Sequence, residues 1–380
     1  MVPDPFSSQM SSKTKQKLRL SSNAPKQIDS LFLKVGKRRA GRSLCFLCGK
    51  KLDKANRSDE HVFPTWLQKR FNLWNQELIL LNGTSIPYRQ ITIPCCKTCN
   101  NVYLGRIEKA VEVAVSSGAK AVRGLSPVIL LVWLSKILYG VLYREHLLHF
   151  DRKTRVKGRL VPKTFLAKLL SFYLFLQAAR VDMKFMGFFP ASIFVFDVQV
   201  PQDVRIQFDF TDSPVFLAVA CRLGGVGIIA ALQDGGAQKV FWGKQMTRFQ
   251  SLHLHPTQFS ELVTRVFYQA SLFNRIPKYL TIETDGKYLV HQMPLQGLST
   301  KPIYDKGDVY TYARFLSVRT GYPLGQLYKA PDKVRTFLED SKGKLIKWDV
   351  GDGVWEVRDR VEIENLLARI GRKFIKDYLR

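Results

Sequence analysis

The chain has 380 residues, of which 46% are hydrophobic and 12% aromatic, and this apolar content excludes an intrinsically disordered protein. A formal net charge of +28 favours a polyanionic partner, nucleic acid before an anionic membrane surface, although a basic surface without a partner also fits. Five of the six cysteines lie between Cys45 and Cys99, which indicates a metal site in a reducing compartment and not a secreted disulfide framework. The N-terminus has no apolar segment typical of a signal peptide, so we expect a cytoplasmic protein of two or more domains.

Residues 1–42 predict a flexible basic arm, because Ser, Lys and Gln are frequent there and bulky apolar residues are rare. The end of this arm carries a basic run that can contact phosphates, formed by Lys37, Arg38, Arg39 and Arg42. A solvated linker without a ligand explains the same run equally well.

Residues 43–118 contain two Cys-x-x-Cys pairs, Cys45 with Cys48 and Cys96 with Cys99. Two such pairs separated by tens of residues are typical of one tetrahedral zinc ion held by four thiolates. Cys95 adjoins Cys96 and leaves the register open, but the spacing to Cys99 favours Cys96 as the ligand. We expect Cys221, alone in a predicted strand, to be a buried apolar residue.

An acid–histidine pair, Glu60-His61, lies between the two cysteine pairs on a predicted strand from Ser58 to Pro64. A carboxylate suits a hard divalent cation, and a neutral histidine beside it can accept a proton from water. Asn100 begins a helix predicted to run to Val115, and its amide oxygen can be a further ligand. A structural histidine and a helix-capping asparagine are the simpler interpretation, but their position within the zinc bracket favours catalysis.

The segments Glu60-His61-Val62-Phe63-Pro64 and Cys96-Lys97-Thr98-Cys99-Asn100-Asn101 resemble the zinc-containing subgroup of HNH endonucleases, which share a ββα-metal motif. The resemblance implies that His61 is the general base, that Glu60 and Asn100 hold catalytic Mg²⁺ or Mn²⁺, and that the four cysteines hold a structural zinc. The family's central asparagine is missing from the second predicted strand, Arg89 to Pro94, where Gln90 or Asn82 is the candidate replacement. The resemblance covers less than a quarter of the chain.

The remaining two thirds of the chain predict helices first and then an antiparallel sheet. Residues 119–185 form a helical segment, and its most apolar stretch, Val128 to Tyr143, predicts a buried core helix because it is short for a membrane span and contains Lys136. Residues 186–300 predict an antiparallel sheet followed by a helix, and residues 301–380 a basic α/β segment. The individual predictions are a helix at Phe165–Ala179, strands at Ser192–Val198, Arg205–Phe210, Val215–Cys221 and Val226–Leu232, helices at Phe259–Leu272 and Tyr310–Val318, a strand at Leu345–Val357 and a helix at Glu362–Leu379.

The expected fold class is therefore α+β, with a ββα-metal module, a four-cysteine zinc site, a helical segment and a C-terminal α/β region. The expected function is that of a metal-dependent endonuclease acting on DNA, by analogy in bacterial or phage defence. An RNA nuclease and a non-catalytic nucleic-acid-binding protein with a structural zinc module are the alternatives. The C-terminal region is expected to bind either a ligand or a protein partner, and the sequence does not indicate which.

Overall fold

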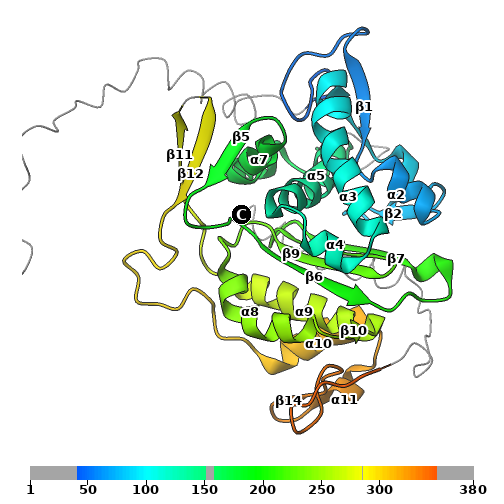
Figure 1. Ribbon diagram of the computed structural model, residues 1–380, viewed down its shortest axis with the longest axis vertical. Helices are drawn as coiled ribbons and strands as arrows, with labels where there is room; N and C mark the ends of the chain where they lie inside the picture. Colours follow the sequence, from blue (N-terminus) through cyan, green and yellow to red (C-terminus); the bar gives the residue numbers. More distant parts are fainter. Residues whose placement is uncertain (1–40, 151–157, 285, 349–380) are drawn as a thin grey trace, which may run out of the picture.

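The computed structural model describes residues 41–150, 158–284 and 286–348 (Figure 1). Its centre is a five-stranded sheet with helices on both faces. Helices α3 (Gly105–Ser116), α4 (Ala119–Arg123) and α5 (Pro127–His146) lie on one side of the sheet, and α8 (Ala237–Phe249) and α9 (Pro256–Leu272) lie on the other. The expected mixed fold with antiparallel sheets is confirmed at this level.

The central sheet has the strand order β10-β6-β9-β8-β7, in which only β10 and β6 are parallel. Its strands are β6 (Ser192–Val198), β7 (Phe208–Ser213), β8 (Ala218–Leu223), β9 (Val226–Ala231) and β10 (His253–Leu254). All residues of β8 and β9 are buried, because helices cover both faces of the sheet. Gly224 and Gly225 form the predicted turn between these two strands.

The N-terminal unit pairs two strands and then continues into a helix. Strand β1 (Arg57–His61) is antiparallel to β4 (Thr92–Cys96), with Glu60 opposite Ile93. Between them lie α2 (Thr65–Arg70), the hairpin of β2 (Glu77–Ile79) and β3 (Ser85–Pro87), and the 3₁₀ turn η1 (Tyr88–Gln90). After β4, the π-helical segment η2 (Thr98–Leu104) leads into α3. The second strand begins later than predicted, because Arg89 and Gln90 belong to the 3₁₀ turn.

Helix α5 is long and apolar enough to cross a membrane by length and composition, but 78% of its most apolar window is buried inside the protein. The predicted core helix at Val128–Tyr143 is part of it. The next predicted helix is divided into α6 (Lys163–Lys168), α7 (Leu170–Leu176) and η4 (Gln177–Ala179), because Leu169 leaves helical geometry. One hydrophobic core contains residues from Cys45 to Val290, so the cysteine region, these helices and one sheet face share an interior.

The C-terminal part adds a second core and a smaller sheet. Strands β5 (Asp182–Phe185), β11 (Tyr279–Thr284) and β12 (Lys287–Gln292) form a three-stranded sheet in the order β11-β12-β5. Helices α8 and α9 pack on the central sheet around the second core. The remaining elements are η5 (Val204–Ile206), α10 (Val309–Thr320), α11 (Leu324–Leu327), β13 (Tyr328–Lys329) and β14 (Lys333–Val334).

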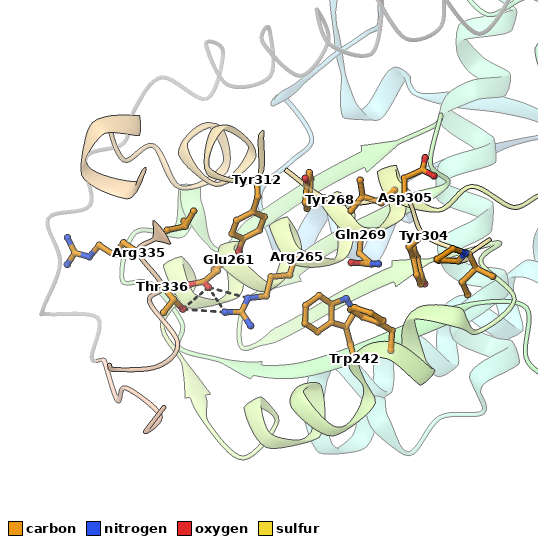
Figure 2. A pocket seen from close by; sticks show the side chains of 16 residues that line it. Trp242, Glu261, Arg265, Tyr268, Gln269, Tyr304, Asp305, Tyr312, Arg335 and Thr336 are labelled. Carbon is orange, nitrogen blue, oxygen red and sulfur yellow. Dashed lines mark hydrogen bonds and ion pairs between the residues drawn. The ribbon is translucent and has the colours of Figure 1, made fainter. Parts of the chain in front are cut away.

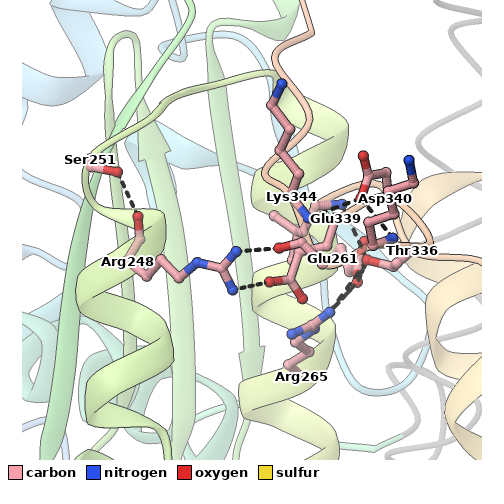
Figure 3. A network of polar contacts seen from close by, with 11 residues as sticks. Arg248, Ser251, Glu261, Arg265, Thr336, Glu339, Asp340 and Lys344 are labelled. Carbon is pink, nitrogen blue, oxygen red and sulfur yellow. Dashed lines mark hydrogen bonds and ion pairs between the residues drawn. The ribbon is translucent and has the colours of Figure 1, made fainter.

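A polar network fastens the last described segment to α8 and α9 (Figure 3). Arg248 on α8 donates to Glu339 and to the carbonyl of Gly343. Glu261 on α9 accepts from the backbone N–H of Phe337 at 2.6 Å and from the hydroxyl of Thr336 at 2.7 Å. These contacts place residues 336–344 beside two helices that are distant in sequence.

Several predicted elements differ from the structure. Helix α8 was not predicted, because its apolar residues do not follow one face: Val240 and Phe241 are exposed, whereas Gln238 is buried. The strand predicted from Arg205 starts only at Phe208, after the 3₁₀ turn η5. The described part of the strand predicted at Leu345–Val357 is not a strand, and Leu345 makes only an isolated bridge with Glu339. The rest of that stretch, the helix predicted at Glu362–Leu379 and residues 1–40 lie outside the described residues.

Candidate metal centre and acid–histidine strand

The first cysteine pair lies on a tight turn that is fixed by backbone hydrogen bonds. The N–H of Cys45 donates to the carbonyl of Lys50, and the N–H of Gly49 donates to the carbonyl of Cys45, both at 2.8 Å. Gly49 has φ 70°, a left-handed backbone conformation in which glycine carries no steric penalty. The N–H of Phe46 donates to the carbonyl of Pro94, which brings this turn to the end of β4 and hence to the second pair.

The four cysteines predicted to bind zinc lie together, with the sulfur atoms of Cys45, Cys48, Cys96 and Cys99 all within 4.8 Å of one another. A zinc–sulfur bond of about 2.3 Å in a tetrahedron places two sulfurs about 3.8 Å apart. The Sγ atoms of Cys48 and Cys96 are 3.8 Å apart. The cluster therefore fits a metal such as zinc, as the spacing predicted.

Cys95 also approaches this cluster, with its Sγ 3.8 Å from that of Cys45, but the group of four contains Cys96 in its place. Hydrogen bonds from Cys48, Cys95 and Cys99 lower the pKa of Cys45 far below its usual value. The hydrogen bond to Cys45 is also the main reason that the pKa of Cys48 rises to about 11. Metal binding requires deprotonated thiols, and a cysteine with a lowered pKa loses its proton more readily.

Glu60 points into the core, where it meets a buried lysine. The Lys136 ammonium on α5 lies 2.5 Å from Glu60 Oε1 and 2.6 Å from Glu108 Oε1 on α3. It also donates to the carbonyls of His61 at 2.8 Å and Val62 at 3.1 Å. Lys136 is 1% exposed and Glu60 3% exposed, so this is an ion cluster inside the protein. Two carboxylate oxygens and two backbone carbonyl oxygens therefore surround the Lys136 ammonium.

The protonation of this cluster follows from its two carboxylates and single ammonium. Burial opposes the charge on Lys136, but Glu108 and Glu60 outweigh that effect and raise the pKa of the lysine. Burial raises the pKa of Glu60, and Glu108 adds to the rise, although Lys136 acts in the opposite direction. The ammonium therefore stays charged, and Glu60 holds a proton more readily than an exposed carboxyl group.

Gly140 explains how α5 comes close enough for Lys136 to reach these partners. A Cβ atom at Gly140 would lie 2.9 Å from both methyl carbons of Val62 and 3.4 Å from Ile93 Cδ1. Residues four apart in a helix lie on the same face, so Gly140 and Lys136 face the paired strands together. The missing side chain permits a close approach that a larger residue would prevent.

His61 lies at the end of β1, next to the exposed Trp74, with 6.2 Å between the two ring centroids. Burial lowers the pKa of His61, and the nearby Lys136 ammonium lowers it further, against the smaller influence of Glu108 and Asp59. A neutral imidazole near pH 7 is the form that can accept a proton. The cation that the structure places near this histidine is the Lys136 ammonium.

Asn100 connects the start of the helical segment to β1. Its Nδ2 donates to Ser58 Oγ at 2.7 Å and to the carbonyl of Asp59 at 3.5 Å. Its Oδ1, the atom expected to bind a metal, makes no hydrogen bond with the described residues. Among the described residues, no hydrogen bond or ion pair joins any two of Glu60, His61 and Asn100. What the three share is their position, where β1 meets the start of the helical segment.

The two candidates for the missing asparagine lie in different places. Asn82 is engaged in its own loop, where its Oδ1 accepts from Thr84 and its Nδ2 donates to the carbonyl of Phe150. Gln90 is exposed and directly precedes Ile91. The carbonyl of Ile91 accepts a hydrogen bond from the N–H of Val62, the residue after His61. Gln90 is therefore the candidate nearer to the acid–histidine strand.

The basic run is only partly described. Arg42 is exposed, and its carbonyl accepts from Arg57 Nη1 at 3.0 Å, which places it on the surface beside the start of β1. Lys37, Arg38 and Arg39 lie outside the described residues. Their predicted contact with phosphates stays a prediction.

Sequence reasoning missed Lys136 and Glu108 as partners of Glu60. The available signal was the single charge inside the apolar stretch Val128 to Tyr143, because a buried lysine needs an acidic partner. The sequence does not say which of 31 acidic residues supplies it. Only the packing of α3 and α5 against β1 selects Glu60 and Glu108.

No protein-family model, curated protein or solved structure matches this chain.

Proposed function

We propose that the protein is a metal-dependent endonuclease of the HNH type that acts on nucleic acid, with DNA as the first substrate to test. The observation that carries the proposal is the bond from Asn100 to Ser58, which holds the start of a helix against the strand that bears Glu60 and His61. A four-cysteine cluster lies at the same junction and would hold it together once zinc is bound. The net charge of +28 supplies attraction for a polyanion.

In the proposed reaction His61 accepts a proton from a water molecule, which then attacks a phosphodiester. The low pKa of His61 supports this role, because a protonated imidazole cannot act as a base. Glu60 and Asn100 would hold Mg²⁺ or Mn²⁺, whose charge stabilises the phosphate and the leaving oxygen.

In this proposal the ion binds the carboxylate oxygen of Glu60 that Lys136 does not contact. Glu60 contacts Lys136 through Oε1, and a carboxylate has lone pairs on two oxygens, so a cation would bind through the other oxygen. Asn100 Oδ1 and the exposed side of His61 would complete the site. In this proposal Lys136 holds Glu60 in position and keeps His61 neutral.

The test is the nicking of supercoiled plasmid in Mg²⁺, with a single-stranded RNA substrate in parallel. His61→Ala should lower the rate about a hundredfold or more, as expected for a general base, while nucleic-acid binding stays unchanged. His253→Ala is the matched control, since this exposed histidine lies on the edge strand β10. Asn100→Ala should raise the Mg²⁺ concentration needed for half-maximal rate, and exposed Asn101→Ala should not. Full activity of His61→Ala would refute the assignment of the base.

The ion pair between Glu60 and Lys136 favours a second candidate, a nucleic-acid-binding protein with a structural zinc module and no catalysis. In that case Lys136 permanently takes the place of a metal ion. Tight binding of DNA or RNA by the zinc-loaded protein, without cleavage at any Mg²⁺ or Mn²⁺ concentration, would support it. Cleavage that depends on His61 would exclude it.

A further inference from the structure

A cavity of about 730 Å³ lies between α8, α9 and the segment 302–307, away from the cysteine cluster (Figure 2). Aromatic side chains form much of its wall: Phe241, Trp242, Tyr268, Tyr304 and Tyr312. The rings of Phe241 and Trp242 meet edge to face at 4.9 Å, and Phe241 lies 5.5 Å from Tyr304. Figure 2 shows Trp242, Gln269 and Tyr304 around one part of the cavity. The volume is within the usual range for small-molecule sites.

Three polar groups in this wall have no hydrogen-bond partner among the described residues. Trp242 Nε1 and the hydroxyl of Tyr304 are buried and unpaired. The side-chain amide of Gln269, on α9, makes no hydrogen bond although the residue is only 7% exposed. Trp242 Nε1 and the Tyr304 hydroxyl are closed off from solvent, so the amide of Gln269 is the unpaired group of these three that remains open to a partner in the cavity. Gln269 offers a donor and an acceptor side by side, which matches a ring edge that carries both.

The buried charges at the cavity are already compensated. Arg265 donates to Glu261 Oε1 from Nη2 at 2.8 Å and from Nε at 3.2 Å. Glu261 also accepts from Thr336 and from the backbone of Phe337, so its carboxylate is satisfied. At the rim, Asp305 and Arg335 are exposed and opposite in sign. The inner wall, where Arg265 and Glu261 form an ion pair, thus presents no free charge to a ligand, and Arg335 at the rim is exposed.

We propose that this cavity binds an uncharged, planar heteroaromatic molecule of the nucleoside class. The ring would stack on Trp242 or Tyr304, and its hydrogen-bonding edge would pair with the amide of Gln269. This site is separate from the acid–histidine strand and does not depend on the proposed nuclease activity.

The experiment is isothermal titration calorimetry of the full-length protein with adenosine, guanosine, cytidine and uridine. At least one should bind, and its monophosphate should bind no more tightly, because the inner wall, where Arg265 and Glu261 form an ion pair, has no free positive charge. Trp242→Ala and Gln269→Leu should each weaken binding by about tenfold or more. Trp242→Phe keeps a smaller ring for stacking, and its affinity should lie between those of wild type and Trp242→Ala.

Gln245→Leu is the matched control, because Gln245 is exposed on the same helix α8 and does not line the cavity. It should bind the nucleoside as the wild type does, and so should His61→Ala. Thermal unfolding by circular dichroism checks that each variant is folded. Absence of binding by all four nucleosides, or equal affinity of wild type, Trp242→Ala and Gln269→Leu, would overturn the proposal.

Discussion

Replacement of Lys136 by methionine tests the ion cluster that links α5 to β1 and α3. Methionine fills a similar volume without the charge, so the variant leaves Glu60 and Glu108 without their ammonium. It also removes the donor to the carbonyls of His61 and Val62. The substitution therefore isolates the electrostatic role of Lys136 from its role in packing.

The expected loss of stability is large, because the buried carboxylate of Glu60 cannot return to water. Removal of one partner from a buried ion pair costs about 3–5 kcal/mol. Glu60 is 3% exposed, and two backbone acceptors lose a donor as well, so we expect a loss of about 4–5 kcal/mol at pH 8. Lys109→Met is the matched control, since Lys109 pairs with Glu112 on the surface and is 71% exposed. It should change stability by less than about 0.5 kcal/mol.

The loss should also depend on pH. Burial already raises the pKa of Glu60 to about 7 in the wild type, and the lost ammonium raises it further, against about 4.3 in the unfolded chain. The native variant then binds protons more tightly than its unfolded state, so its stability increases as pH falls. Urea denaturation followed by tryptophan fluorescence at pH 5 to 8 should show the difference from wild type shrinking toward pH 5. A loss below about 1 kcal/mol, independent of pH, would refute the reasoning.

Three further predictions concern zinc, salt and packing. Purified protein should contain one zinc ion per chain by metal analysis, and Cys45→Ser should lose it, whereas Cys221→Ser, a buried cysteine outside the cluster, should keep it. Deletion of residues 1–42 should reduce the slope of log K for DNA against log salt, because fewer counterions are released; an unchanged slope would place the phosphate contacts elsewhere. Gly140→Ala should lower the free energy of unfolding by about 1–3 kcal/mol, since its Cβ would lie 2.9 Å from Val62; an unchanged urea midpoint would contradict that contact.

The sequence alone determined the features that depend on local spacing. Paired cysteines on tight turns predicted the four-sulfur cluster, because a Cys-x-x-Cys turn presents two sulfurs to one point whatever surrounds it. Strand β6 was predicted with its observed bounds. The predicted turn at Gly224-Gly225 joins strands β8 and β9. The apolar run in α5 predicted a buried helix, since so many large apolar side chains need an interior.

Tertiary structure decided which charges meet. Lys136 follows Glu60 by tens of residues, and no periodicity links them; the contact exists because α5 packs against β1 with a glycine at the crossing point. The cavity beside α8 has the same origin, because its wall combines the helices α8, α9 and α10 with residues 302–307 and 334–336. The sequence did not predict helix α8, because some of its apolar residues are exposed and the apolar positions therefore do not repeat with the period of a helix. Local propensity acts between neighbours in the chain, whereas the partner of a buried charge and the shape of a cavity depend on surfaces that only folding brings together.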